Sequence, residues 1–119
     1  MKTQKRKKSL KNKDEVFMGF PEPRSIRDLQ QEAHDTAKRH GFWDKDKNDG
    51  ECIALMHSEL SEALEGIRKD RWVNVAEEMA DTVIRIMDFC EAHKIDLYNA
   101  IENKMLDNRI RPYKHGKKF

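Results

Sequence analysis

Acidic residues recur in one local pattern at two places in the chain. Residues 59–64 and residues 78–83 each read acid, large apolar, small, acid, small, aliphatic, and the second segment begins nineteen residues after the first. If both segments are helical, the two acids of each segment lie on one side of the helix, beside its apolar stripe. The acids that could act together in chemistry are Glu59, Glu62, Glu78 and Asp81.

A convergence of four carboxylates predicts a bound cation. Like charges raise each other's pKa values unless a cation lies among them. Oxygen donors without histidine or cysteine suit Mg²⁺, which often keeps waters and substrate phosphates as ligands, and Mn²⁺ could substitute. Di-iron bundles use a Glu-x-x-His motif, which is absent here although His57 precedes Glu59 by two residues. A single Glu-x-x-Glu pattern is common on solvated helix faces, but its repetition beside apolar stripes favours a metal site.

Apolar residues at helical spacing predict the elements that position these acids. The first helix begins after Ser25, an N-cap with Asp28 in the first turn, and ends at Gly41. A loop over residues 41–50 then leads to the second helix. The stripe of the first helix is Ile26, Leu29, Ala33 and Ala37. The stripe of the second is Ile53, Met56, Leu60, Ala63 or Leu64, and Ile67.

The third and fourth helices follow from a second set of caps. Asn74 with Glu77 three residues later is a variant capping box and predicts a third helix that runs to about His93. Its wide stripe, which is typical of a central helix, includes Val75, Met79, Val83, Ile86 and Cys90. Asp96 predicts the start of a fourth helix that runs to about Asn108. This helix is expected to bury Leu97, Ile101, and Met105 or Leu106.

The predicted fold class is all-α. No alternating β pattern, hairpin dipeptide or glycine-rich nucleotide loop occurs in the sequence. Short connections between consecutive helices make neighbours antiparallel. We therefore expect a four-helix bundle in which the two acidic helices form a central antiparallel pair.

Composition and charge narrow the class of protein. A chain of 119 residues forms one domain. A membrane protein is excluded because 39% of the residues are charged and no run approaches the roughly 20 apolar residues of a spanning helix. The first thirteen residues carry +7 and residues 109–119 carry +5, so the overall charge of +2 leaves −10 on the rest. We expect a disordered basic tail over residues 1–15, a helical domain over 16–111 and a basic tail over 112–119.

The start of the chain and its cysteines indicate a cytoplasmic protein. No apolar segment follows the basic start, so a secretory signal is not expected. Cys52 and Cys90 are too few for a disulfide framework and form no Cys-x-x-Cys motif. Both are predicted to be reduced, buried thiols.

The acidic motifs, followed by Lys104-x-x-x-Asn108, resemble the MazG-like family of all-α nucleotide pyrophosphohydrolases over roughly residues 25–111. The first motif departs from the family pattern, because Ser58 stands where the family often has a first glutamate. The second motif keeps the full form, Glu77-Glu78 followed by an aspartate. The resemblance implies a MazG-like bundle and Mg²⁺-dependent cleavage of a nucleoside triphosphate between the α and β phosphates, giving the monophosphate and pyrophosphate.

The resemblance also implies roles for particular residues. The four acids would hold the metal, and either Glu59 or Glu62 would act as general base. The residues expected to bind phosphate are Lys104, Asn108, Arg109 and Arg111. A narrower similarity, to the branch that acts on deoxycytidine-type nucleotides, places His34 and Trp43 at the base, with Trp72 as a second aromatic wall. Alone, each of these three residues would more often be a surface, core or interface residue. Family members are typically dimers or tetramers, so we expect a homodimer or homotetramer.

Two other functions remain open at this stage. The chain could act on a different substrate with the same fold, as the related phosphoribosyl-ATP pyrophosphohydrolases do. It could instead be a non-enzymatic helical module whose lysine-rich tail binds nucleic acid. The charge of −10 on residues 14–108 repels a duplex, so nucleic acid is not the expected partner.

Overall fold

The computed structural model describes residues 22–119, so the expected disordered tail at residues 1–15 lies outside the described part of the chain. The described residues form four α-helices and one short 3-10 helix, and they contain no β-strand. The elements are α2 (Ile26–Arg39), α3 (Asp49–Arg68), α4 (Trp72–Ala92), α5 (Leu97–Ile110) and η1 (Tyr113–Gly116). The prediction of an all-α chain with four helices is confirmed for these residues.

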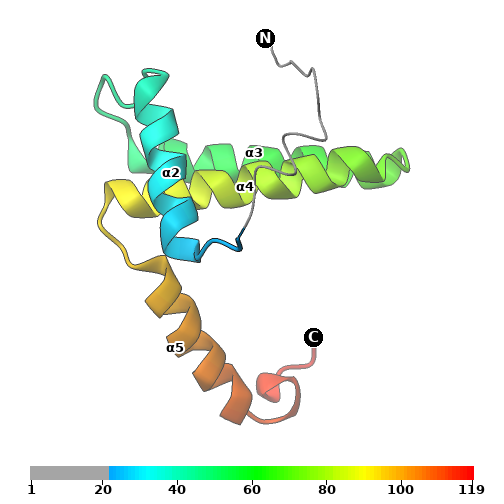
Figure 1. The fold of residues 1–119 in the computed structure, drawn as a ribbon. Helices are drawn as coiled ribbons and strands as arrows, with labels where there is room; N and C mark the ends of the chain where they lie inside the picture. Colours follow the sequence, from blue (N-terminus) through cyan, green and yellow to red (C-terminus); the bar gives the residue numbers. More distant parts are fainter. Residues whose placement is uncertain (1–21) are drawn as a thin grey trace.

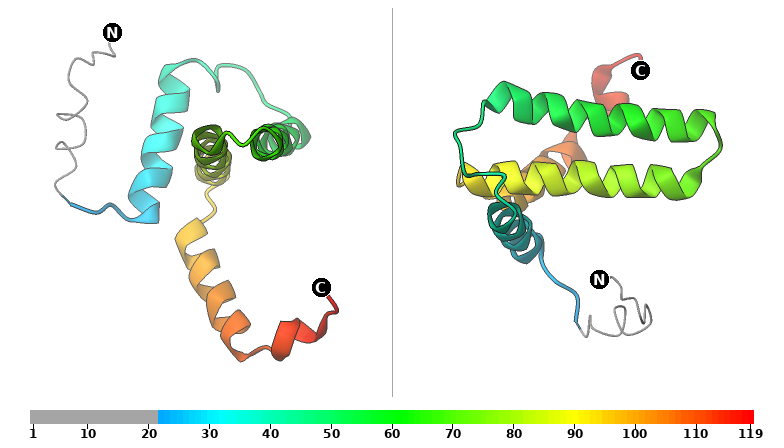
Figure 2. Two further views of the ribbon diagram at one scale, coloured as in Figure 1. Left: turned by 90° about the vertical axis from the view of Figure 1, so that its right-hand side faces the viewer. Right: turned by 90° about the horizontal axis from the view of Figure 1, so that it is seen from above.

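Helices α3 and α4 form the longest feature of the fold. They lie side by side, run in opposite directions and are joined by a short turn (Figure 2). Helix α2 packs against α4 at the end of this hairpin that is far from the turn (Figure 1). Helix α4 therefore packs against both α2 and α3, which agrees with its wide apolar stripe.

Side-chain caps fix the starts of three helices. The Ser25 hydroxyl accepts from the Asp28 backbone N–H at 3.1 Å, which confirms the predicted cap of α2. Asn48 caps α3 by accepting from the backbone N–H three residues later at 3.1 Å. Asp96 caps α5 in the same way at 3.1 Å, as predicted. At the other end of α2, Gly41 has a φ of +84°, a left-handed conformation that favours glycine and ends the helix.

The start of α4 differs from the prediction. Asn74 and Glu77 do not cap this helix, because α4 begins at Trp72 and its N-cap, Arg71, makes no side-chain cap hydrogen bond. The backbone forms this turn instead, since the Arg71 N–H donates to the Gly66 carbonyl at 2.7 Å. Because this hydrogen bond joins the end of α3 directly to the N-cap of α4, the helix has already begun when the chain reaches Asn74.

The buried face of α3 lies beside the predicted stripe rather than on it. Leu60 is 43% exposed, and Ile53 and Ile67 are exposed as well. Helix α3 packs chiefly against α4, and the line that faces α4 is Cys52, Met56, Glu59, Ala63 and Gly66. The predicted stripe is therefore wrong for most of its members, because within residues 22–119 only one side of α3 has a neighbour.

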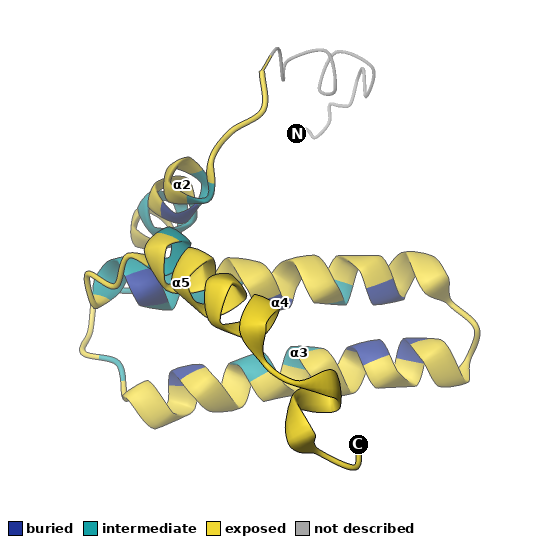
Figure 3. Cartoon of the chain, turned by 90° about the horizontal axis from the view of Figure 1, so that it is seen from below, coloured by how far each residue is buried: buried dark blue, intermediate teal, exposed yellow. Residues whose placement is uncertain are grey.

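The same correction holds for parts of α4 and α5. Met79 and Val83 of α4 are exposed, whereas Val75 and Cys90 are buried as predicted. Helix α5 has no buried residue, since it contacts α2 near its start and then leads away from the hairpin (Figure 1). Its predicted core residues are exposed, except for the half-buried Leu97. Figure 3 shows how small the buried part of the chain is.

Cys52 and Cys90 are buried and free, as predicted. Burial raises the pKa of the Cys90 thiol, which keeps it protonated. Although many apolar side chains are exposed, none of the helices within residues 22–119 has the length and the apolar composition needed to cross a membrane.

Candidate functional site

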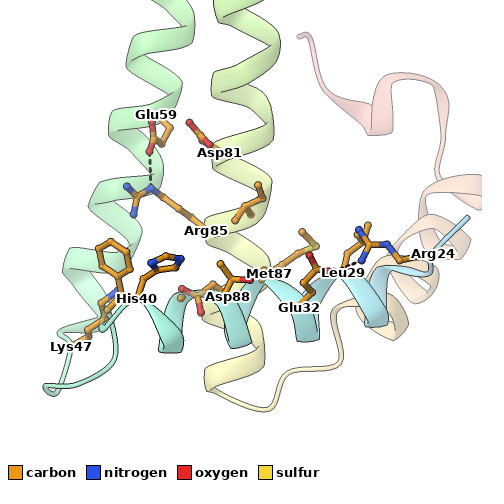
Figure 4. Close-up of a pocket in the computed structure, with 15 residues that line it drawn as sticks. Arg24, Leu29, Glu32, His40, Lys47, Glu59, Asp81, Arg85, Met87 and Asp88 are labelled. Atoms are coloured by element: carbon orange, nitrogen blue, oxygen red, sulfur yellow. Dashed lines mark hydrogen bonds and ion pairs between the residues drawn. The ribbon is translucent and has the colours of Figure 1, made fainter. Parts of the chain in front are cut away.

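Three of the four predicted metal ligands converge across the hairpin. Glu59 of α3 and Glu78 and Asp81 of α4 each offer a carboxylate oxygen, and these oxygens all lie within 4.8 Å of one another. Glu59 belongs to the line of α3 that faces α4, and Figure 4 shows it opposite Asp81. We call these three residues the acidic cluster. Glu62, one turn further along α3, is exposed and lies outside it.

The raised pKa of Glu78 shows that the carboxylates of the acidic cluster repel one another. Partial burial, together with hydrogen bonding to and repulsion from the nearby carboxylates of Glu59 and Glu62, raises the pKa of Glu78 from 4.5 to about 7. Its Oε1 atom is buried and has no hydrogen-bond partner among the described residues. A buried acceptor without a partner is costly, so this oxygen is suited to a ligand that the polypeptide does not supply.

Arg85 supplies the one cation hydrogen-bonded to the acidic cluster within the described residues. Its Nε atom donates to Glu59 Oε2 at 2.8 Å (Figure 4). This guanidinium holds the pKa of Glu59 below its ordinary value, against the effect of burial. The pKa values of Glu59 and Glu78 therefore shift in opposite directions, because Glu59 has a cationic partner and Glu78 has none among the described residues.

The donor set fits a hard divalent cation. All three residues of the acidic cluster donate carboxylate oxygen, which Mg²⁺ and Mn²⁺ prefer. A positive charge among them would relieve the repulsion that raises the pKa of Glu78, and it would give the unpartnered Glu78 oxygen a ligand. The residues present therefore fit such an ion.

A cavity of about 560 Å³ opens beside the acidic cluster, between α2 and the hairpin. Glu59, Asp81 and Arg85 line it where α3 and α4 meet (Figure 4). His40, Phe42 and Lys47 also line it, and they belong to the C-cap of α2 and the loop that follows. Much of the wall between them is apolar. This volume lies in the range typical of small-molecule sites.

Two of the predicted base-binding residues come together on Asp88. Its Oδ1 accepts from the Trp43 indole N–H at 2.9 Å and lies 2.8 Å from His34 Nδ1. The two rings meet edge to face, with their centroids 5.4 Å apart. Asp88 itself lines the cavity, but His34 and Trp43 line a separate hollow of about 350 Å³ beside it. The ring nitrogens of His34 and Trp43 therefore contact Asp88, which lines the cavity, but do not line the cavity themselves.

The remaining predicted residues lie away from the cavity in this chain. Trp72 is at the turn of the hairpin, where it is 60% exposed and donates to Asp70 at 2.9 Å. The expected phosphate-binding residues belong to α5 and its C-cap, are exposed and do not line the cavity: Lys104, Asn108, Arg109 and Arg111. The structure brings together the acids, and separately His34 with Trp43, but not the α5 residues or Trp72.

Sequence reasoning missed Arg85 and Asp88. Both lie on the cavity side of α4, four and seven residues after Asp81, which is the spacing of residues on one helix face. That spacing was a usable signal. Lys47 was also missed, and its Nζ atom lies 4.6 Å from the centre of the Trp43 ring. Nothing in the sequence marks this lysine among its charged neighbours.

No family model, curated protein or solved structure matches the chain. The function must therefore be argued from the acidic cluster and the cavity beside it.

Proposed function

We propose that the protein is a Mg²⁺-dependent nucleoside triphosphate pyrophosphohydrolase of the MazG-like kind. The observation that carries the proposal is the acidic cluster of Glu59, Glu78 and Asp81, of which Glu59 and Asp81 line a cavity of about 560 Å³. Grouped carboxylates beside a partly apolar cavity suit a substrate with an anionic end and a flat, less polar end. A nucleoside triphosphate has this character, and the resemblance of the acidic motifs points to the same substrate class.

The acidic cluster would bind the metal ion, and Glu62 would act as the general base. A divalent ion held by the cluster would screen phosphate charge and lower the pKa of the attacking water. Glu62 lies outside the cluster and is exposed, so its carboxylate is available to accept the proton of that water. Glu59 is the other candidate base, but its pairing with Arg85 makes it a weaker proton acceptor.

The cavity would hold the nucleoside on the α2 side of the acidic cluster. Phe42 offers a ring there, with Lys47 5.7 Å from its centre. Stacking on an aromatic ring contributes roughly 1–3 kcal/mol and tolerates different bases. His34 and Trp43 would then affect base binding indirectly, because their hydrogen bonds fix the position of Asp88 in the cavity wall.

A second copy of the chain would complete the assembly. The hairpin exposes a set of apolar side chains that single-chain proteins rarely leave in water: Ile53, Leu60, Leu64, Ile67, Met79 and Val83. A homodimer or homotetramer would cover them. It could also bring Lys104 and Asn108 of one chain to the phosphates bound by another, since α5 leads away from the acids of its own chain.

The proposal is tested by incubating the purified protein with ribo- and deoxyribonucleoside triphosphates, and with phosphoribosyl-ATP, in the presence of Mg²⁺. The expected products are the monophosphate and pyrophosphate. Asp81→Asn and Glu62→Gln should each lower kcat/KM by about 100-fold or more. Glu65→Gln is the matched control, because Glu65 lies on α3, does not line the cavity and pairs with the exposed Arg68 and Lys69.

Two results would contradict this function. Release of orthophosphate and a nucleoside diphosphate would show cleavage at the wrong bond. A complete lack of hydrolysis, together with salt-sensitive binding to nucleic acid that deletion of residues 1–15 abolishes, would favour the non-enzymatic module.

A further inference from the structure

Arg85 has no role in the mechanism above, yet it lies at the junction of the acidic cluster and the cavity. It follows Asp81 by one helical turn on α4 and lines the cavity. Its Nε atom donates to Glu59 at 2.8 Å, and the side chains of Arg85 and Glu59 are 39% and 12% exposed. The Arg85 guanidinium thus neutralises and hydrogen-bonds the largely buried carboxylate of Glu59.

This ion pair competes with a metal ion for the same carboxylate. Glu59 supplies one of the three oxygens that converge within 4.8 Å. A divalent ion at that point would repel the guanidinium and take over the neutralisation of Glu59. Arg85 would then be free to turn, because its side chain is long and more than a third exposed.

The cavity is where a released guanidinium would go. Arg24 and Lys47 are the other arginine and lysine that line it. Arg24 pairs with Glu32, and Lys47 lies over the ring of Trp43, away from the acidic cluster. Arg85 alone of these three is bonded to a member of the cluster. Its planar fork of N–H donors matches two phosphate oxygens at once.

We propose that Arg85 is an exchange residue: it neutralises Glu59 in the metal-free chain and binds the triphosphate once a divalent ion takes Glu59. This inference rests on the proposed function, because it requires both a metal and a phosphate ligand. It assigns the phosphate contact within one chain to α4, next to the acids, rather than to the distant α5.

The test measures metal binding and phosphate binding separately. Mn²⁺ affinity is measured on the metal-free protein by electron paramagnetic resonance, without nucleotide. Affinity for inorganic tripolyphosphate is measured by calorimetry at saturating Mg²⁺. The variants are Arg85→Gln and Arg85→Lys, and the matched control is Arg68→Gln, which removes an arginine that also pairs with a glutamate of α3 but does not line the cavity.

The exchange predicts effects of opposite sign. Arg85→Gln should bind Mn²⁺ about three- to tenfold more tightly, because a competing cation is gone. It should bind tripolyphosphate at least about tenfold more weakly, because a charged hydrogen bond is lost. Arg85→Lys should keep the Mn²⁺ affinity of the natural chain and bind tripolyphosphate with intermediate affinity, since lysine has the charge without the fork. Arg68→Gln should change neither.

Other results separate this inference from the proposed function. If the natural chain binds Mn²⁺ and hydrolyses triphosphates, but Arg85→Gln lowers both affinities or leaves tripolyphosphate binding unchanged, Arg85 is merely structural and the exchange is wrong. If the natural chain binds no Mn²⁺, the proposed function and the exchange fail together. Should Arg85→Gln not fold, Arg85→Lys decides, and a tripolyphosphate affinity equal to that of the natural chain would overturn the phosphate contact.

Discussion

The two ends of the α3–α4 hairpin carry similar tryptophan–aspartate hydrogen bonds in different surroundings. At the end covered by α2, the Trp43 indole donates to Asp88 at 2.9 Å, and His34 meets the same carboxylate. At the turn, the Trp72 indole donates to Asp70 at the same 2.9 Å, but Trp72 is 60% exposed. The same donor–acceptor distance therefore belongs to a part-buried hydrogen-bond network at one end and to a solvent-exposed hydrogen bond at the other.

The two ends differ in how completely one chain covers its own hairpin. The covered end is held by polar groups from three segments, including the bond from Gln30 of α2 to Glu91 of α4 at 3.0 Å. At the turn end the two helices approach closely at Gly66, since a Cβ there would lie 3.0 Å from a methyl of Val75. The outer apolar side chains of this end are exposed within the described residues. The acidic cluster lies at the boundary between the two ends.

The largest expected effect concerns the uncovered end. Leu64 and Met79 lie on opposite helices and are both exposed. If a second copy covers them, Leu64→Lys with Met79→Lys places two charges in an apolar interface and weakens self-association by about a thousandfold or more. Light scattering and sedimentation across a concentration series would measure this. Phe119→Lys, at an exposed position outside both the hairpin and α5, is the control and should keep the oligomer. A natural chain that stays single at every concentration would contradict the assembly.

The next largest effect concerns the covered end. Asp88→Ala leaves the donors of Trp43 and His34 without their shared acceptor, and it should lower the free energy of unfolding by about 2–3 kcal/mol. Denaturant titration would measure the loss. Asp70→Asn at the turn is the comparison, and its expected effect is within about 0.5 kcal/mol because the contact is exposed. Equal losses for the two variants would remove the distinction between the ends.

The sequence predicted those features that depend on residues close together in the chain. The sequence indicates Ser25 and Asp96 as caps because an N-cap side chain accepts from a backbone N–H only three residues later. The convergence of Glu59 with Asp81 was expected from two matching motifs on neighbouring helices. In these cases the local pattern and the tertiary contacts favour the same arrangement.

Features that depend on the neighbours of a helix could not be predicted in the same way. Ile53 and Leu60 have the spacing of core residues, but their side of α3 has no partner in the part of the chain that the structure describes. Arg85 and Asp88 share a face with Asp81, yet their partners come from α3, α2 and the loop after it. Choosing such partners requires knowing which segments meet, and the sequence pattern of one helix does not contain that information.

A smaller effect sharpens the comparison at the tryptophans themselves. Trp43→Phe and Trp72→Phe remove the same N–H donor and the same part of the ring. The first should cost about 1 kcal/mol more than the second, because only Asp88 is left with an unmet, part-buried acceptor site. Thermal melts of the two variants at one protein concentration would show the difference. A larger loss for Trp72→Phe would mean that the turn end is buried in the assembly, and would thereby support the second copy.

The smallest expected effect is a pH dependence at the boundary, where Glu78 lies. Its pKa is raised from 4.5 to about 7 in the metal-free fold, so between these values the folded chain holds a proton that the unfolded chain has released. The stability of the natural chain in a chelator should therefore fall, relative to Glu78→Gln, as the pH rises from 4.5 to 7, and level off above 7. Solvent reaches this carboxyl, which keeps the fall in stability small.

Mg²⁺ should abolish this fall in stability, because a cation among the carboxylates favours their ionised form. Parallel stability curves for the two proteins, with and without Mg²⁺, would mean that Glu78 titrates as an ordinary surface acid and that the cluster does not hold a cation.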